Sequence, residues 1–142
     1  MVNLGCKYII IDHLSIIVSD QKGDERRDLD EISTKLKTLA MELGIAIIAV
    51  IHQNRQGQIR GTAGVEQLAN IVLKASRDVE SASEWRRNVT KISVQKNRFC
   101  GITGPGVYLF YDHITTRLMD LTEDEIRAYE EGEEPGMVEA PW

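Results

Sequence analysis

The sequence predicts an α/β fold with a mostly parallel sheet and antiparallel additions at its C-terminal end. Tyr8–Ile11 and Ile45–Ile51 are short apolar runs without alternation, the pattern of strands that are buried on both faces of a parallel sheet. A helical pattern separates these runs, and a strand, helix, strand order makes the two strands parallel. After residue 88 the pattern changes to alternation, which predicts the antiparallel part.

The segment between the two apolar runs has the spacing of an amphipathic helix. Its large apolar residues are three or four positions apart and are Leu29, Ile32, Leu36, Leu39 and Leu43. Gly44 follows, where a helix often ends in a left-handed residue. The preceding residues 19–25 are polar and include Gly23, which predicts a loop before the helix.

Short elements and loops follow the second strand. We expect a loop over Gln53–Gly61, a short helix over Val65–Ala69 and a third buried strand over Ile71–Ala75. Arg77–Arg87 is charged and has no clear periodicity, which indicates a surface loop.

Three further strands are expected in the antiparallel part. Val89–Gln95 alternates, as a strand with one solvated face does. A glycine-containing turn over Lys96–Gly106 leads to Val107–Tyr111, which pairs with the preceding strand or with Arg117–Leu121.

The C-terminal end is acidic. From Asp120 onward there are nine acidic residues and one basic residue, whereas residues 1–119 hold 16 basic and 13 acidic residues. Thr122 and Glu125 form a capping box, which predicts a short helix over 122–129 after a folded part over 1–121. Residues 130–142 are expected to be a disordered acidic tail.

The composition is ordinary for one soluble domain, with 142 residues of which 42% are hydrophobic and 27% charged. Cys6 and Cys100 have no metal-binding spacing, and His13, His52 and His113 are scattered, so no zinc set is predicted. No apolar run approaches the roughly 18 residues that span a bilayer, and no signal-peptide pattern is present. A reducing cytosol without membrane attachment is the simplest setting.

Polar residues follow both parallel strands. Asp12 comes after the first strand and His52 after the second, so both are expected at the C-terminal edge of the sheet, where open α/β sheets bind ligands. A buried strand that ends in Asp is the Walker B pattern, whose carboxylate holds the Mg²⁺ of a bound nucleotide. The alternatives are a turn cap for Asp12 and a structural hydrogen bond for His52.

Several polar motifs recur in one order. They are Asp12-His13, His52, the octapeptide R-G-T-A-G-V-E-Q over Arg60–Gln67, and Lys96-x-Arg98. In this order the chain resembles, over about Lys7 to Met119, the RecA-like motor of ring-shaped replicative helicases. It is more similar to the helicase half of the primase-helicases of T-odd-type podoviruses than to DnaB helicases. The resemblance implies the C-terminal half of a RecA-like P-loop NTPase core.

The resemblance implies roles for individual residues. Asp12 would be the magnesium-side carboxylate, and His52 would contact the γ-phosphate. Gln67 would read the nucleotide state, and Arg98 would be an arginine finger that reaches the neighbouring subunit's nucleotide. For Arg98 the alternative is a solvated basic turn.

Further positions match the nucleotide and DNA contacts of the family. Lys96, Arg77 and Tyr111 would bind the nucleotide, the last two by clamping its base, although Tyr111 could equally be an ordinary core or surface aromatic. DNA-binding positions would be Arg55, Arg60, Gly61 and Thr62.

Two departures from the family pattern affect the expected activity. The sequence contains no G-x-x-x-x-G-K-[ST] phosphate loop and no upstream catalytic glutamate, so it looks like the second half of a motor. Mg²⁺ and ATP or dTTP would bind only together with the missing N-terminal half, and the chain alone would be inactive. The segment between His52 and Arg60 is shorter than the DNA-gripping loop of the podovirus relatives.

The resulting hypothesis is the C-terminal part of a ring helicase that unwinds DNA in the 5′ to 3′ direction, in a phage-infected bacterial cytoplasm. Its implied partners are single-stranded DNA, other subunits or the N-terminal half, and a replicative DNA polymerase bound through the tail with Trp142. The alternative is a non-catalytic, split or decayed helicase fragment that acts as an interaction protein in the phage replisome. A recombinase-type ATPase is disfavoured because such chains carry their own phosphate loop.

Overall fold

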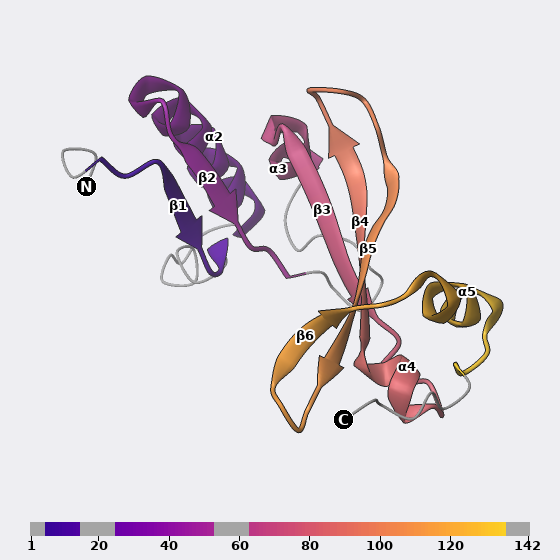
Figure 1. Ribbon diagram of the computed structural model, residues 1–142. Coiled ribbons are helices and arrows are strands. Elements are labelled where there is room, and N and C mark those ends of the chain that lie inside the picture. Colours follow the sequence, from indigo (N-terminus) through magenta and orange to yellow (C-terminus); the bar gives the residue numbers. More distant parts are fainter. Residues whose placement is uncertain (1–4, 15–24, 53–62, 136–142) are drawn as a thin grey trace. The chain divides into compact units, whose positions relative to one another are not determined.

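The computed structural model describes residues 5–14, 25–52 and 63–135 (Figure 1). The chain divides into two compact units, Met1–Asn70 and Ile71–Trp142. The loops predicted over 19–25 and 53–61 lie outside the described residues, apart from Glu25, where a helix begins.

The first unit contains a strand, helix, strand motif, as predicted. Strand β1 (Tyr8–Ile11) pairs in parallel with β2 (Ala46–Ala49). Between them in sequence is α2 (Glu25–Leu43), which is followed by Gly44 in the left-handed region with φ 61°. The second strand is shorter than the predicted apolar run at both ends.

The apolar stripe of α2 builds the core of the first unit. Leu29 on the helix and Leu14 after β1 are buried, with 0% and 2% of their surface exposed. The partly buried residues packed against them are Ile11, Ile32, Leu36, Ile51 and Val65. The last of these comes from the short helix α3 (Ala63–Leu68), which corresponds to the predicted helix at 65–69. Four segments therefore share one small core: the end of β1, α2, the end of β2 and α3.

The strands are not buried on both faces, contrary to the prediction. Tyr8 and Ile10 are each 62% exposed and Ile48 is 54% exposed, whereas Ile11 packs into the core. Side chains of a strand alternate between two faces, so the helices described in this unit cover only one face. Ile71 and Leu73 in the second unit are likewise exposed, which corrects the prediction of a third fully buried strand.

The second unit is built on an antiparallel sheet with the strand order β3-β4-β5-β6. These strands are β3 (Ile71–Arg77), β4 (Val89–Asn97), β5 (Gly104–Asp112) and β6 (Arg117–Asp120). The pairing of β5 with both neighbours resolves the alternatives that the sequence left open. The α/β class is confirmed, and the described strands form one parallel and three antiparallel pairs.

A short helix lies where a surface loop was predicted. This helix, α4 (Glu84–Asn88), begins after Ser83, whose hydroxyl accepts a hydrogen bond from Arg86 N at 3.2 Å. The prediction over Arg77–Arg87 was wrong here because five residues are too few to show helical periodicity. Trp85 on this helix packs against the core of the unit.

Helix α5 (Glu123–Glu131) closes this core. Its capping box is formed in both directions between Thr122 and Glu125, as predicted. The buried residues below it are Val89, Tyr108 and Leu121, surrounded by Trp85, Phe110, Ile126 and Tyr129. The helix ends at Glu131, two residues beyond the predicted end, with Gly132 as its C-cap, so Glu130 belongs to the helix and not to the tail. Residues 136–142 lie outside the described chain.

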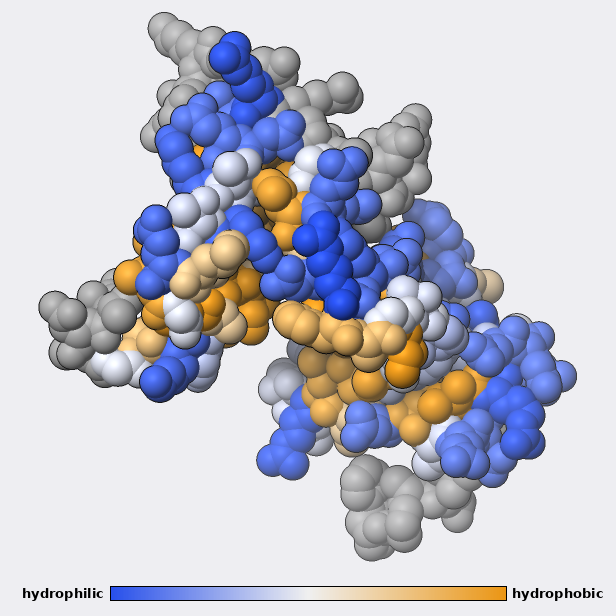
Figure 2. Space-filling view, turned by 90° about the horizontal axis from the view of Figure 1, so that it is seen from above, coloured by the Kyte–Doolittle hydropathy of each residue, from blue (hydrophilic) through white to orange (hydrophobic). Residues whose placement is uncertain are grey.

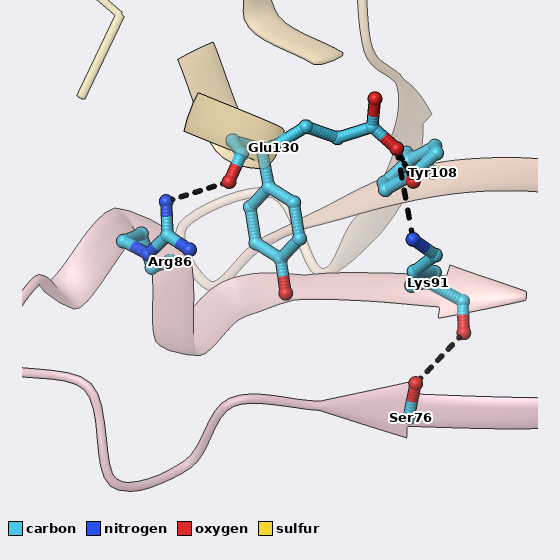
Figure 3. A network of polar contacts seen from close by, with 6 residues as sticks. Ser76, Arg86, Lys91, Tyr108 and Glu130 are labelled. Atoms are coloured by element: carbon cyan, nitrogen blue, oxygen red, sulfur yellow. Dashed lines mark hydrogen bonds and ion pairs between the residues drawn. The ribbon is translucent and has the colours of Figure 1, made fainter. Parts of the chain in front are cut away.

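Polar contacts attach α5 to the sheet and to α4 (Figure 3). The hydroxyl of Tyr108 donates to Glu130 Oε1 at 2.5 Å, and Lys91 Nζ lies 3.6 Å from the same oxygen. Arg86 Nη1 donates to the carbonyl oxygen of Tyr129 at 2.9 Å, and its guanidinium lies 4.5 Å from the centre of the Tyr129 ring. The helix is therefore held at two places near its C-terminal end.

We expect acid to loosen α5. The hydrogen bond from Tyr108 holds the pKa of Glu130 below its ordinary value of 4.5. A carboxyl whose pKa is lower in the folded state stabilises that state above about pH 4.5 and loses this contribution as the pH falls through the folded pKa. In a Trp142→Phe background, the fluorescence of Trp85, whose ring centre is 6.0 Å from that of Tyr129, should report this acid transition.

The matched variants are Glu130→Gln and Glu134→Gln. The first should remove the contribution of Glu130 to the acid transition, and the second, an exposed glutamate beyond the helix, should leave it in place. An identical acid transition in both variants would show that the bond between Tyr108 and Glu130 does not attach the helix.

Large apolar side chains reach the surface in both units, and Figure 2 shows several such patches in orange. Exposed apolar surface of this extent on a small protein is typical of an interaction site. Among the described residues, no helix is long and apolar enough to cross a membrane.

Candidate functional site

The candidate site lies where β1 ends. Val50 N donates to Ile11 O at 2.9 Å, and Leu14 N donates to Val50 O at 3.0 Å. The main chain of Val50 makes both bonds, and the two residues between Ile11 and Leu14 form a small loop between them. These residues are Asp12, whose side chain is exposed, and His13, and the peptide bond between them is cis.

The end of β2 brings His52 to the same place. The ring centres of His13 and His52 are 4.3 Å apart, with an angle of 71° between the ring planes. The parallel strand order predicted that Asp12 and His52 would share one edge of the sheet, and the structure places His52 against the residue next to Asp12. His13, to which the sequence assigned no role, is thus a missed member of the site.

The core of the first unit fixes the base of this loop. Leu14, directly after His13, is 2% exposed and packs with Leu29 of α2. On the other side of the loop, Ile11 packs against the same core. The polar residues at 12 and 13 are therefore displayed between two anchored apolar neighbours.

The donor set fits one kind of metal site. Within the described residues there is no group of three or more His, Cys, Asp or Glu side chains that could hold a metal ion. Mg²⁺ is usually bound by one or two carboxylates, with the remaining positions taken by water and nucleotide phosphates. The lone exposed carboxylate of Asp12 fits that arrangement and not a site built from protein ligands alone.

The other candidate residues of the first unit lie on or before α3. Gln67 is exposed on this helix, whose Val65 packs into the core with Leu14 and Leu29. The candidate DNA-binding positions precede the helix and lie outside the described residues: Arg55, Arg60, Gly61 and Thr62.

Lys96 and Arg98 lie in different local structures. Strand β4 runs to Asn97, so Lys96 is a strand residue opposite Val72, and Arg98 begins the following turn. The prediction that both residues follow the strand was wrong because the strand is two residues longer than its alternating pattern. Arg98 is exposed, and Lys96 is half-buried.

The turn that carries Arg98 is ordered by Asn97. The side-chain oxygen of Asn97 accepts hydrogen bonds from Phe99 N at 3.0 Å and from Cys100 N at 3.4 Å. Its main-chain oxygen accepts a third from Gly101 N at 2.9 Å. The main chain around Arg98 is thus held by bonds that do not involve the arginine side chain.

The two candidate base-clamping residues, Arg77 and Tyr111, both have neighbours within the second unit. Arg77 Nε and Nη2 donate to the carbonyl oxygen of Arg87 at 2.9 and 2.5 Å, and Nη2 also donates to Asn88 Oδ1 at 3.1 Å. These bonds join the end of β3 to the end of α4. Tyr111 is half-buried on β5, in register with Leu118 of β6.

Comparison with known proteins gives one family. The DnaB-like helicase C terminal domain family matches residues 2–120. A DNA helicase/primase of Enterobacteria phage T3 is 29% identical over 127 residues, which are 79% of this chain and 22% of that protein. The replicative DNA helicase DnaB of Geobacillus stearothermophilus is 31% identical over 108 residues, which are 66% of this chain and 24% of that protein.

Two solved structures have a similar fold. The first is the structure of a DnaB-like replicative helicase, which was described together with its interactions with primase. Its TM-score is 0.60 at 23% identity, and the match covers 81% of this chain and 31% of the helicase chain. A KaiC-like protein of Pyrococcus horikoshii has a TM-score of 0.62 at 16% identity. The match covers 84% of this chain and 51% of the Pyrococcus chain. These likenesses show the RecA-like α/β fold.

Proposed function

This chain belongs to the family of DnaB-like helicase C-terminal domains, and on that basis we propose that it acts as the C-terminal part of a replicative ring DNA helicase. The chain spans less than a quarter of the first curated relatives, so the activity of the whole motor is part of the proposal. The observation that carries it is the loop of Asp12 and His13 beside His52, at the sheet edge where α/β enzymes bind nucleotides.

In this proposal the first unit contributes the residues that sense the nucleotide. Asp12 binds the Mg²⁺ of ATP or dTTP, and His52 contacts the γ-phosphate. Bound with the nucleotide, Mg²⁺ neutralises charge on the phosphate oxygens during transfer. Gln67 passes the nucleotide state on to DNA-contacting residues before α3, which are Arg55, Arg60, Gly61 and Thr62.

The second unit contributes to the neighbouring subunit of the ring. Arg98 stands at the start of a turn whose main chain is ordered by Asn97, which suits a side chain that reaches a phosphate group outside its own subunit. Lys96 accompanies it on β4, and Arg77 and Tyr111 face the base. Hydrolysis then drives movement in the 5′ to 3′ direction on single-stranded DNA.

Exposed apolar surface supports a role within a larger assembly. On the β1 and β2 face, Tyr8, Ile10 and Ile48 are more than half exposed. In the second unit Leu73 and Leu118 are 61% and 59% exposed. A part of a motor needs such surfaces for its other parts, whereas a self-sufficient domain would cover them.

We expect the chain alone to show no nucleotide hydrolysis above background, because its sequence contains no phosphate loop whose main-chain donors and lysine hold the phosphates. Mixed with a polypeptide that carries the phosphate-loop half, it should give turnover on the order of one per second or more. A hydrolysis assay of the two parts, separate and mixed, measures this.

Asp12→Asn should return the mixture to background, whereas Asp120→Asn, at an exposed carboxylate on β6, should not. Turnover by the chain alone that disappears with Asp12→Asn would contradict the proposal. A mixture that forms a stable complex but stays inactive would support the alternative of a non-catalytic interaction protein in the replisome.

We also propose that the acidic tail docks on a replicative DNA polymerase. Acidic residues steer a peptide to a basic surface, and a terminal aromatic residue such as Trp142 is a typical anchor. A labelled peptide of residues 132–142, the part after α5, should bind the polymerase more weakly as salt rises, and Trp142→Ala should weaken binding by at least about 1 kcal/mol, several-fold in affinity.

Met137→Ala is the matched control in the same peptide, because it removes a large apolar side chain away from the terminus. Equal binding by the wild-type and Trp142→Ala peptides would leave the tail only a solubilising role.

A further inference from the structure

We propose that His13 is a positioning residue for His52: its ring packs against the His52 ring and fixes the direction in which that imidazole points. This inference rests on the proposed function, in which His52 contacts the γ-phosphate. It assigns a role to a residue that the sequence motif contains but gives no function.

His52 needs such a neighbour. Its side chain is exposed, and it lies beyond the last residue of β2, Ala49, and two residues beyond Val50, which bonds to the β1 side. An exposed side chain at such a position has several rotamers of similar energy. The edge contact with His13, at 4.3 Å between ring centres, favours one of them.

His13 is itself well held. It stands between Asp12 and Leu14, and Leu14 is 2% exposed and bonded to Val50 O. The Nδ1 atom of His13 is buried and has no hydrogen-bond partner among the described residues. Among the described residues, packing therefore holds this ring.

Two variants of His13 distinguish packing of the ring from hydrogen bonding by its nitrogens. If the ring acts by packing, His13→Phe should preserve its effect, because phenylalanine keeps an aromatic ring of similar shape and has no ring nitrogen. His13→Ala removes the ring. A residue that contacts phosphate through a nitrogen would lose its function in both variants.

The first test uses the chain alone and no nucleotide. Carbethoxylation by diethylpyrocarbonate, followed by mass spectrometry, gives the modification rate of His52 relative to the exposed His113 of the second unit. Removing a packed ring should raise this ratio at least about twofold in His13→Ala, and His13→Phe should keep it at the wild-type value. An unchanged ratio in His13→Ala would overturn the contact.

The second test uses the reconstituted motor. His13→Ala should lower kcat by about two- to tenfold, the range that one aromatic pair contributes, with KM little changed. His13→Phe should restore kcat. In a double-mutant cycle, His13→Ala should have no further effect on kcat once His52 is alanine, because His13 acts by positioning the His52 ring.

The outcomes separate the two proposals. Additive effects of the two alanine variants, or a loss in His13→Phe equal to that in His13→Ala, would overturn the positioning role. Full activity of His52→Ala alone would instead overturn the proposed phosphate contact of His52, while the modification rates would still decide whether the rings pack.

Discussion

Replacing Arg98 with alanine is expected to lower nucleotide hydrolysis by the reconstituted motor roughly 10³-fold or more, the scale of arginine-finger losses. A finger acts on the charge that develops during phosphoryl transfer in the neighbouring subunit. Nucleotide binding within its own subunit should therefore change little. Hydrolysis and equilibrium nucleotide binding, measured on the same preparation, check both parts of this expectation.

Arg98→Ala should leave the main chain of its turn in place. The hydrogen bonds that order the turn come from Asn97 to the main chain of Phe99, Cys100 and Gly101, so they do not require the arginine side chain. Arg127→Ala is the matched control, because that arginine is exposed and its ion pair on α5, at 3.5 Å from Asp124, lies on the surface. Equal loss of binding and turnover in Arg98→Ala would identify Arg98 as a structural residue or a ligand of its own subunit's nucleotide.

The local elements were predictable because their signals are local. The stripe from Leu29 to Leu43 determines one helix face, and the strand, helix, strand order determines a parallel pair. These two facts together predict that Asp12 and His52 share one sheet edge. The capping box at Thr122 was likewise predictable from the sequence, because it needs only two residues at a fixed spacing.

Features that depend on tertiary contacts were not predictable. Whether a strand is covered on both faces depends on what packs against it, and the described part of the chain leaves Tyr8 and Ile48 of this apolar pattern exposed. The hydrogen bonds of Arg77 to the end of α4 were not predictable, because that helix is too short to show periodicity. The contact of His13 with His52 joins residues 39 positions apart and has no sequence signature.

The end of α5 shows how one contact can override composition. The run E-E-G-E-E-P-G has too little apolar surface to fold by itself, which predicted a tail from residue 130. Glu130 nevertheless stays in the helix, where it accepts the Tyr108 hydroxyl and lies near Lys91. Its partners are on β4 and β5, so far away in the sequence that the composition around Glu130 does not indicate the contact.

The same dependence of a site on distant packing predicts a large effect for Leu29→Ala. Leu29 is fully buried against Leu14, and a buried leucine truncated to alanine costs about 2–5 kcal/mol. A unit of this size has a total stability of only about 4–10 kcal/mol at typical values per residue. The amide of Leu14, which donates to Val50 O, should therefore exchange with solvent roughly 30-fold faster or more.

Leu39→Ala provides the matched control, since it removes the same atoms from the same helix at a position that is 38% exposed. Its effect on the exchange of the Leu14 amide should be several-fold at most, because a half-exposed side chain loses less burial and leaves no cavity. Leu14 anchors the loop of Asp12 and His13, so Leu29→Ala should also abolish the protection of His52 by His13 against carbethoxylation. Equal effects of the two leucine variants would show that the core below the candidate site does not hold that loop in place.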